Sequence, residues 1–210
     1  MQDKERLVIE SEVHPHVPEE RAELFTAYDG GSTEVEYLEL LSALVRCTKP
    51  RRILETGSFL GHGTLALARA ARENGFGEVV SIEPNAKAAA AVRDLLDQQE
   101  LDHVQVVLSQ SLPYLDAEDE PFDFAFLDSC LPTRALELDR LLHRNLLTPG
   151  SIVAIHDTSR RRRDAHGKSD PETAVFWAEL GRVLAHHGVE ERLELPLSRG
   201  LLLLRIGSDS

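Results

Sequence analysis

The sequence predicts an α/β protein with a doubly wound sheet that carries helices on both faces. From residue 51 onward, short apolar runs alternate with longer runs of helical periodicity, which is the pattern of parallel strands joined by crossover helices. The run at 122–127 is almost continuously apolar, as expected of a strand buried on both faces. Two adjacent strand-like runs end the chain and predict a hairpin whose last strand is antiparallel to the others.

The individual elements are predicted from periodicity and from the residues that begin and end helices. Strands are expected at residues 53–56, 78–82, 104–108, 122–127, 151–155, 191–197 and 200–206. Helices are expected at residues 34–46, 64–74, 86–99, 111–115, 132–146 and 171–187. Asn85 is the expected N-cap of the third helix, and Thr33 with Glu36 fits a capping box before the first. The Thr-Pro-Gly sequence at 148–150 predicts a turn.

The chain is predicted to be a single domain with a helical N-terminal extension. The extension covers residues 1–48 and the main domain residues 49–210, because the alternation of strands and helices begins only in the second range. Pro15 and Pro18 interrupt regular structure near the N-terminus, and a short helix could follow at residues 18–28.

Composition and charge bound the class of protein. The 210 residues suffice for one α/β domain, and a formal net charge of −13 disfavours a broad nucleic-acid-binding surface. The two cysteines form no C-x-x-C motif, so neither a disulfide framework nor a zinc site is expected, and Cys130 is expected to be a small buried residue. There is no apolar signal core and no apolar run of membrane-spanning length. These features favour a soluble cytoplasmic protein without a membrane partner.

A glycine-rich turn between the first strand and the following helix predicts a ligand pocket. Residues 51–64 read RRILETGSFLGHGT, with Gly57, Gly61 and Gly63 before the helix. Glycines let the backbone pass close to a ligand, and the helix start offers unpaired N–H groups. Glu55 at the mouth of the turn would repel a phosphate, and the spacing differs from the G-x-G-x-x-G of dinucleotide sites. A cationic ligand without phosphate fits better, and S-adenosylmethionine, with its sulfonium and ammonium groups, is such a ligand.

Five segments in order resemble the motifs of class I S-adenosylmethionine-dependent methyltransferases. They read ETGSFLGHGT, VSIEPN, SLPYLD, FAFLDS and LLTPGSIVAIHD. The similarity is greatest to the caffeoyl-CoA and catechol O-methyltransferase-like group. The resemblance implies a Rossmann-like seven-stranded sheet of order 3-2-1-4-5-7-6, and it makes residues 49–210 an S-adenosylmethionine-binding catalytic domain. It also favours a homodimer in which the N-terminal arm packs across the interface.

The resemblance implies cofactor contacts around the glycine turn and the strands that follow. Glu83 would hold the ribose hydroxyls, since both can donate to one carboxylate, and its alternative role is to support the N-cap of the next helix. Glu55 would place its charge near the methionine moiety, whereas Gln110 and Ser111 would touch adenine mainly through their backbone. The expected cofactor-binding residues are Ser32, Glu55, Gly57, Ser58, Phe59, Gly61, His62, Thr64, Glu83, Pro84, Gln110, Ser111 and Asp128.

Two carboxylates end neighbouring strands of the predicted sheet. Asp128 and Asp157 are therefore expected to meet at its carboxyl edge, where they could hold a hard cation such as Mg²⁺. In the resembling enzymes matching acids do so together with an asparagine, and the metal lowers the pKa of a catechol-type hydroxyl. Here Thr158 stands where the asparagine is expected, and no lysine base follows Asp128. The expected metal ligands are Asp128, Asp157 and Thr158, with metal dependence left open against structural or capping roles for the acids.

Asp128, Asp157 and His156 are the candidate catalytic residues. Imidazole titrates near neutral pH, so His156 could act as general base on a substrate hydroxyl. Strand alternation opposes this role, because His156 should point away from the site if Asp157 points into it. His62 in the glycine turn is a second candidate base, although contact with the cofactor is its favoured role.

Four consecutive arginines, Arg160, Arg161, Arg162 and Arg163, follow the fifth strand. Such a run is commonly a solvated face. In the loop after this strand, however, it could clamp a carboxylate or phosphate of an anionic substrate.

The sequence therefore predicts an enzyme that moves the sulfonium methyl group to a hydroxyl oxygen of a small molecule. A tRNA methyltransferase is an alternative that the arginine run favours and the net charge opposes. A non-catalytic, cofactor-binding partner subunit is a second, because the lysine and asparagine of the resembling group are missing. A nicotinamide dehydrogenase fits the glycine spacing poorly.

Overall fold

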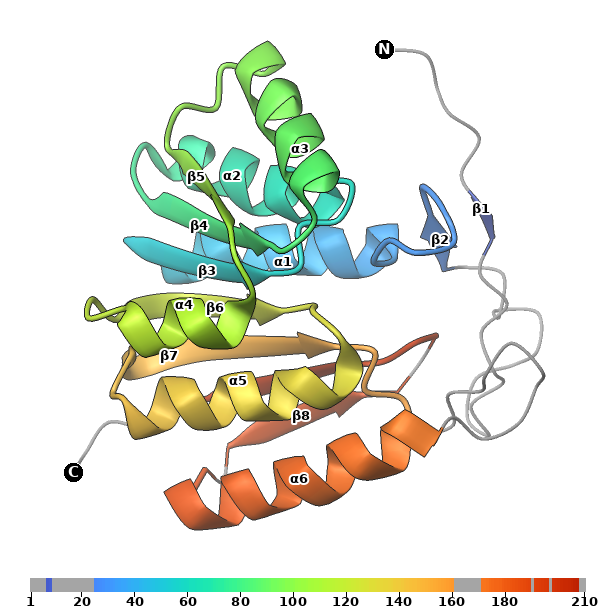
Figure 1. The fold of residues 1–210 in the computed structure, drawn as a ribbon, viewed down its shortest axis with the longest axis vertical. Helices are drawn as coiled ribbons and strands as arrows, with labels where there is room; N and C mark the ends of the chain where they lie inside the picture. Colours follow the sequence, from blue (N-terminus) through green and yellow to red (C-terminus); the bar gives the residue numbers. More distant parts are fainter. Residues whose placement is uncertain (1–6, 9–24, 161–170, 190, 197, 208–210) are drawn as a thin grey trace.

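The structure is a computed structural model that describes residues 7–8, 25–160, 171–189, 191–196 and 198–207. It is built around one seven-stranded sheet of order β5-β4-β3-β6-β7-β9-β8 (Figure 1). The strands are β3 (Arg52–Thr56), β4 (Glu78–Glu83), β5 (Val104–Leu108), β6 (Phe122–Leu127), β7 (Leu147–His156), β8 (Arg192–Leu195) and β9 (Leu201–Arg205). Within this sheet β9 alone runs in the opposite direction to the other strands. The predicted order 3-2-1-4-5-7-6 is therefore confirmed, counting β3 as the first strand.

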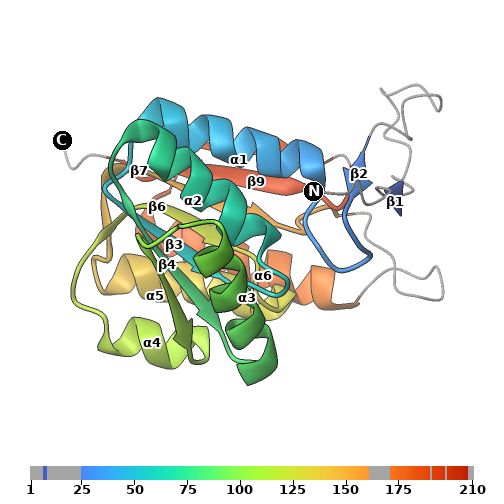
Figure 2. The same cartoon turned by 90° about the horizontal axis from the view of Figure 1, so that it is seen from above.

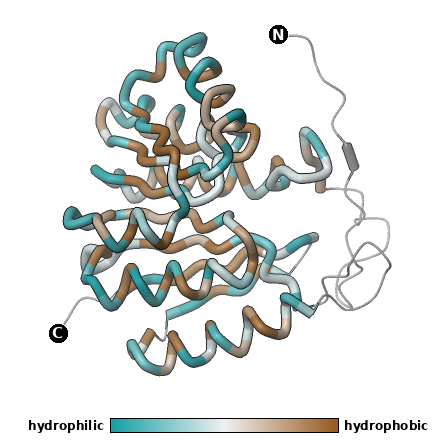
Figure 3. The backbone as a smooth tube through the Cα atoms, viewed as in Figure 1, coloured by the Kyte–Doolittle hydropathy of each residue, from teal (hydrophilic) through white to brown (hydrophobic). Residues whose placement is uncertain are grey.

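Helices cover both faces of the sheet, as predicted. They are α1 (Val35–Thr48), α2 (His62–Asn74), α3 (Ala86–Gln98), α4 (Ser111–Ala117), α5 (Leu131–His143) and α6 (Pro171–His187). One apolar core joins the sheet to α1, α2 and α3, and a second joins it to α4, α5 and α6. Figure 2 shows α1 and α2 on one side of the strands and α4 and α5 on the other. Hydrophobic and hydrophilic segments alternate along α5 and α6, as expected of helices with one buried face (Figure 3).

The central strand β6 is apolar at every position except Asp123 because helices cover both of its faces. Phe124 and Phe126 enter the core beneath α1 and α2, whereas Ala125 and Leu127 enter the core beneath α5. Successive side chains of a strand point to opposite faces, so a strand covered on both faces needs apolar residues on both. The predicted bounds of this strand and of β5 are confirmed.

Local capping is predicted correctly for one helix and wrongly for another. The Asn85 carboxamide oxygen accepts hydrogen bonds from the backbone of Lys87 and Ala88, which confirms it as the N-cap of α3. The capping box before α1 is not formed. Glu36 instead accepts hydrogen bonds from the backbone N–H and the hydroxyl of Thr26, and the Thr33 hydroxyl donates to Asp128. Tertiary partners thus take both side chains away from the helix end.

Two further expectations differ from the structure. Residues 148–150, predicted to form a turn, lie inside β7, where the pairing with β6 is irregular and Gly150 has a φ of +84°. At the N-terminus, Thr26–Ala27 forms strand β2, paired with β1 (Leu7–Val8), although a helix was expected at 18–28. The rest of that expected helix up to residue 24 lies outside the described residues. Among the described helices, none has the length and apolarity that crossing a membrane requires.

The core on the α5 side gives a matched test of this architecture. Leu138 is fully buried, whereas Leu136 of the same helix is 43% exposed. We expect Leu138→Ala to lower the free energy of unfolding by about 2–5 kcal/mol, because it leaves a cavity against the sheet. Leu136→Ala should change it by less than about 0.5 kcal/mol. Urea denaturation of both variants measures this, and equal losses would contradict the placement of α5.

Candidate active site

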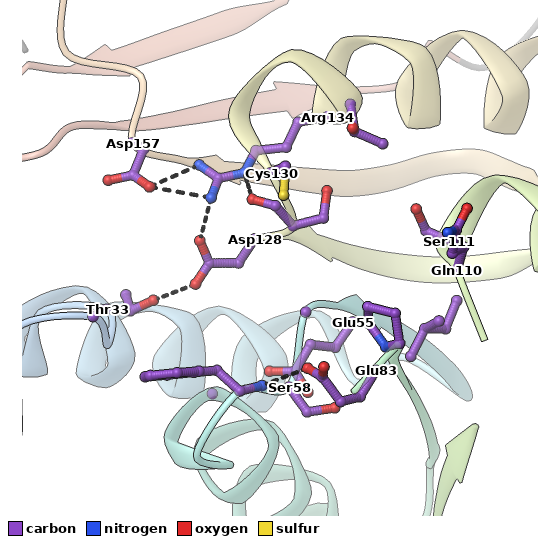
Figure 4. A pocket seen from close by; sticks show the side chains of 18 of the residues that line it. Thr33, Glu55, Ser58, Glu83, Gln110, Ser111, Asp128, Cys130, Arg134 and Asp157 are labelled. Carbon is purple, nitrogen blue, oxygen red and sulfur yellow. Dashed lines mark hydrogen bonds and ion pairs between the residues drawn. The ribbon is translucent and has the colours of Figure 1, made fainter. Parts of the chain in front are cut away.

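A cavity of about 600 Å³ lies at the carboxyl ends of the parallel strands β3, β4, β6 and β7. This edge is where open α/β sheets bind ligands, because the loops that leave the strands diverge there. In Figure 4, side chains from the glycine turn and from the ends of β4 and β6 point toward this cavity. The residues that line it include Ser32, Thr33, Glu55, Gly57, Ser58, Phe59, His62, Glu83, Pro84, Gln110, Ser111, Asp128, Cys130, Arg134 and Asp157.

The glycine turn passes close to the end of β6. A Cβ atom on Gly57 would lie 2.5 Å from the Asp128 carbonyl oxygen, and the residue has a φ of +88°, so only glycine fits here. Gly61 begins α2 in the left-handed conformation. Phe59, between them, also has a positive φ of 47° and is about half exposed at the cavity. A positive φ is uncommon for a residue other than glycine, and it is typical of functional loops.

Glu83 fastens the glycine turn from the end of β4. Its carboxylate accepts hydrogen bonds from the backbone N–H of Phe59 at 2.9 Å and of Asn85 at 2.8 Å, and the residue is 6% exposed. The contact with Asn85 shows the supporting role at the start of α3 that the sequence left open. A carboxylate has about four acceptor positions, so these two bonds leave acceptors for hydroxyl groups in the cavity.

Glu55 lies beneath the turn and is almost fully buried. Its carboxyl accepts hydrogen bonds from the hydroxyls of Thr64, at 2.5 Å, and Ser81. Burial raises the pKa of Glu55, with the nearby acids Asp128 and Glu83 adding to the effect against those two hydrogen bonds, and the pKa reaches about 7. The carboxyl therefore changes charge near neutral pH.

The loop before α1 closes another side of the cavity. The Asp29 carboxylate accepts hydrogen bonds from the backbone and hydroxyl of Ser32, and His62 stacks on Tyr28 with ring centroids 4.5 Å apart. The Arg199 guanidinium, from the turn between β8 and β9, donates to the carbonyls of Ser32 and Gly30 at 2.9 Å. The C-terminal hairpin thus holds the loop that borders the predicted cofactor pocket.

Asp128 and Asp157 meet at the sheet edge, as predicted, but a cation from α5 lies between them. Arg134 Nη2 is 2.9 Å from Asp128 Oδ1 and 3.1 Å from Asp157 Oδ2, and Nη1 is also 3.1 Å from Asp157 Oδ2 (Figure 4). Nη1 donates further to the His156 carbonyl, and Nε donates to the Ser129 carbonyl at 2.7 Å. The five N–H groups of the guanidinium are thereby matched by five acceptor contacts.

His156 lies behind the cavity wall and links two acids. Its Nε2 is 2.7 Å from Glu34 Oε2, and its Nδ1 is 2.9 Å from Asp128 Oδ1. Burial alone would lower the pKa of His156, but the charges of Asp128 and Asp157 and the hydrogen bonds to Asp128 and Glu34 raise it to about 10. The ring is therefore an imidazolium that donates from both nitrogens. This state argues against a role as general base, as does its position outside the cavity lining.

Glu34 completes this chain of charges at its buried end. It is fully buried and accepts hydrogen bonds from His156, from the Ser198 hydroxyl and from the Arg199 backbone N–H at 2.9 Å. Burial alone would raise the pKa of Glu34, but the hydrogen bond and charge of His156, with the bonds from Ser198 and Arg199, lower it to about 2. This role is not predictable from the sequence, because Glu34 has the pattern of an ordinary residue at the start of a helix.

The residues at the expected metal position do not fit a hard divalent cation. Asp128, His156 and Asp157 offer donor atoms within 4.8 Å of one another. His156, however, is protonated, and the space between the two carboxylates is filled by the Arg134 guanidinium. Thr158 is buried and does not line the cavity. A metal ligand needs a free lone pair, which an imidazolium and a guanidinium lack.

Most of the predicted site residues come together, with some exceptions. Of the expected cofactor residues, Gly61 and Thr64 are absent from the cavity lining. The Thr64 hydroxyl instead donates a hydrogen bond to Glu55. Cys130, expected to be buried, is exposed at the cavity, so that prediction is wrong. Arg160 lies 3.5 Å above the Trp177 ring and 3.5 Å from Glu194, and is not in the lining. Arg161, Arg162 and Arg163 lie outside the described residues.

Arg134 is a second residue of the site that the sequence analysis does not include. A signal was present, because Leu131, Ala135 and Leu138 define the buried stripe of α5 and Arg134 lies on it. A charged residue on an apolar stripe needs a buried partner of opposite charge.

Comparison with known proteins places the fold and the cavity in a family. A family model described as a methyltransferase domain matches residues 54–158, which is half of the chain. The chain belongs to this family. The matched range of the methyltransferase begins in β3 and ends after β7, so it contains the glycine turn and both strand-end acids. The resemblance to class I S-adenosylmethionine-dependent methyltransferases of the caffeoyl-CoA and catechol O-methyltransferase-like group is confirmed.

Individual relatives agree with this assignment. The methyltransferase is 25% identical to caffeoyl-CoA O-methyltransferase 1 of Nicotiana tabacum, over 94% of this chain and 89% of the relative. It is 32% identical to catechol O-methyltransferase domain-containing protein 1 of Mus musculus, over 57% of this chain and 47% of the relative. An O-methyltransferase from Bacillus cereus, solved in complex with SAH, superposes with a TM-score of 0.71 at 23% identity, covering 85% of this chain and 84% of that one.

The raised pKa of Glu55 gives a test of the site's electrostatics. Between about pH 4.5 and 7 the folded protein keeps a proton on Glu55 that the unfolded chain has released. This group therefore makes the free energy of unfolding fall as pH rises through that window. We expect Glu55→Gln to remove the effect, so that the variant gains about 2–3 kcal/mol relative to wild type between pH 4.5 and 8.

Urea denaturation across this pH range measures the difference. Glu78→Gln, at the exposed opposite end of β4, is the matched control for removing a carboxylate from the same strand. A pH-independent difference for Glu55→Gln would show that Glu55 ionises normally.

Proposed function

We propose that the protein transfers the methyl group of S-adenosylmethionine to a hydroxyl oxygen of a small molecule. The observation that carries this proposal is the cavity over the glycine turn, with Glu83 at the end of β4 and Glu55 beneath the turn. These carboxylates suit a ligand with hydroxyl and cationic groups and oppose a phosphate. The family assignment and the SAH-bound state of the Bacillus cereus enzyme support the same cofactor.

The cavity suggests an orientation for this cofactor. Glu83 would accept hydrogen bonds from the ribose hydroxyls with the acceptor positions that Phe59 and Asn85 leave open. Gln110 and Ser111, together on one side of the cavity in Figure 4, would border the adenine. The sulfonium and the methionine ammonium would then lie toward Glu55 and toward Asp128, whose charge favours a cation.

The chemistry needs positioning more than covalent help from the protein. The acceptor oxygen forms a bond to the methyl carbon while the sulfur–carbon bond breaks. The electron pair of the broken bond stays on sulfur, so the sulfonium becomes the neutral thioether of S-adenosylhomocysteine. The hydroxyl proton passes to a carboxylate at the cavity or to water. Asp128 Oδ2 is suited to this task, because Thr33 is its one hydrogen-bond donor in the described part of the chain. The enclosed site holds the three reacting atoms in line.

A small molecule fits the site better than an RNA. The net charge of −13 opposes a polyanion, and Arg160 is engaged by Trp177 and Glu194. The names of the relatives, caffeoyl-CoA O-methyltransferase and a catechol O-methyltransferase domain, support a hydroxyl as the acceptor group.

Calorimetric titration with S-adenosylmethionine tests the proposal. We expect Glu83→Gln to weaken binding by about 10–100-fold, because it removes charge-assisted hydrogen bonds to the ribose. Glu78→Gln, at the other end of the same strand, should leave the affinity within about twofold.

Binding by wild type that Glu83→Gln does not weaken would contradict the ribose assignment. Absence of binding by wild type would overturn the proposed cofactor. Release of S-adenosylhomocysteine with a panel of hydroxylated small molecules then tests transfer, and cofactor binding without transfer to any acceptor would favour a non-catalytic subunit.

A further inference from the structure

We propose that the Arg134 guanidinium is the resident cation of this site, so that acceptor binding and methyl transfer proceed without a divalent metal. The inference rests on the proposed function for its catalytic part. Its structural part concerns only the position between Asp128 and Asp157, and stands on contacts within the protein.

The guanidinium fills the position fully. It bridges the two carboxylates at 2.9 and 3.1 Å, and Arg134 is 4% exposed. Its remaining donors are taken by the carbonyls of Ser129 and His156. A divalent ion could enter only if the side chain left this position, which would break five contacts and leave a long cationic side chain without its partners.

The charges of the neighbouring groups are already balanced against one another. Along the chain of contacts, Glu34, His156, Asp128, Arg134 and Asp157 alternate in sign. Both ring nitrogens of His156 already lie within 2.9 Å of carboxylate oxygens, so an added ion would have to break one of these contacts to use the ring.

This arrangement bears on the class of acceptor. A metal recognises a vicinal diol because two oxygens can enter its coordination sphere. Arg134 has no N–H group left to donate to a substrate. The hydroxyl of the methyl acceptor therefore contacts the carboxylate of Asp128 rather than a cation. An acceptor with a single hydroxyl satisfies such a site, and a second neighbouring hydroxyl adds no ligand bond. We therefore infer that the substrates include phenols or alcohols without a vicinal diol.

Mn²⁺ binding tests the structural part without any acceptor, because Mn²⁺ takes the same oxygen ligands as Mg²⁺. We expect wild-type protein to leave the electron paramagnetic resonance signal of Mn²⁺ unchanged. The melting temperature of the protein should also be the same with and without Mn²⁺. Arg134→Met should melt at a lower temperature and bind Mn²⁺ at least about tenfold more tightly than wild type, since one positive charge between two carboxylates is gone.

Two variants control this experiment. Arg140→Met removes an arginine from the same helix that pairs with Asp116 near the surface, and should not change Mn²⁺ binding. Arg134→Lys keeps a positive charge and should bind Mn²⁺ as weakly as wild type. If Arg134→Met does not fold, the wild-type measurement still decides: one Mn²⁺ bound per chain and lost in Asp128→Asn would overturn the proposal.

The catalytic part has its own measurement. Once an acceptor is known from the panel, the rate of S-adenosylhomocysteine release by wild type should be the same within about twofold in EDTA and in Mg²⁺. Loss of turnover in EDTA with recovery in Mg²⁺ would contradict it. Failure to bind S-adenosylmethionine at all would instead overturn the proposed function and leave the Mn²⁺ result to stand on its own.

Discussion

Three carboxylates from distant parts of the chain, two of them buried and one partly buried, lie together at one sheet edge only because two cations lie between them. Glu34 comes from the start of α1, Asp128 from the end of β6 and Asp157 from the end of β7. Each would be costly to bury alone, and an unpaired buried charge destabilises a protein by several kcal/mol, about 3–5 when one partner is removed. His156 and Arg134 pair with them in alternation, so the edge can be both acidic and folded.

This ion network also fixes the parts that surround the cavity. Glu34 binds the turn between β8 and β9 through Ser198 and Arg199, and Arg199 in turn holds the loop that carries Ser32. Asp157, at the far end of the network, has a φ of 59°, a conformation uncommon outside glycine that tends to occur at functional sites. The cofactor side of the cavity, around Glu83 and the glycine turn, is not part of this ion network. It is held by hydrogen bonds from backbone N–H groups. A change in the ion network should therefore affect the acceptor side more than the ribose side.

The sequence predicts what depends on local pattern and misses what depends on tertiary placement. Sheet order, strand ends and the glycine turn follow from apolar runs and turn residues, so Glu83, Asp128 and Asp157 could be placed at one edge. Which groups neutralise those acids depends on the rotation of α5 and on the packing of α1 against the C-terminal hairpin. Arg134 is therefore absent from the predicted site, and Thr33, which was expected in a capping box, donates to Asp128 instead. A metal was expected because the sequence places two acids at this edge of the sheet. The sequence does not show that the Arg134 guanidinium lies between them.

A crystal structure of the protein grown with S-adenosylhomocysteine and MnCl₂, with anomalous data collected for manganese, tests the central claim most directly. We expect the nucleoside to lie against Glu83 and the Arg134 side chain to remain between Asp128 and Asp157, with no anomalous peak at that position. An anomalous peak between the two carboxylates, with the guanidinium displaced, would contradict the account. It would show that this edge of the sheet holds a metal after all.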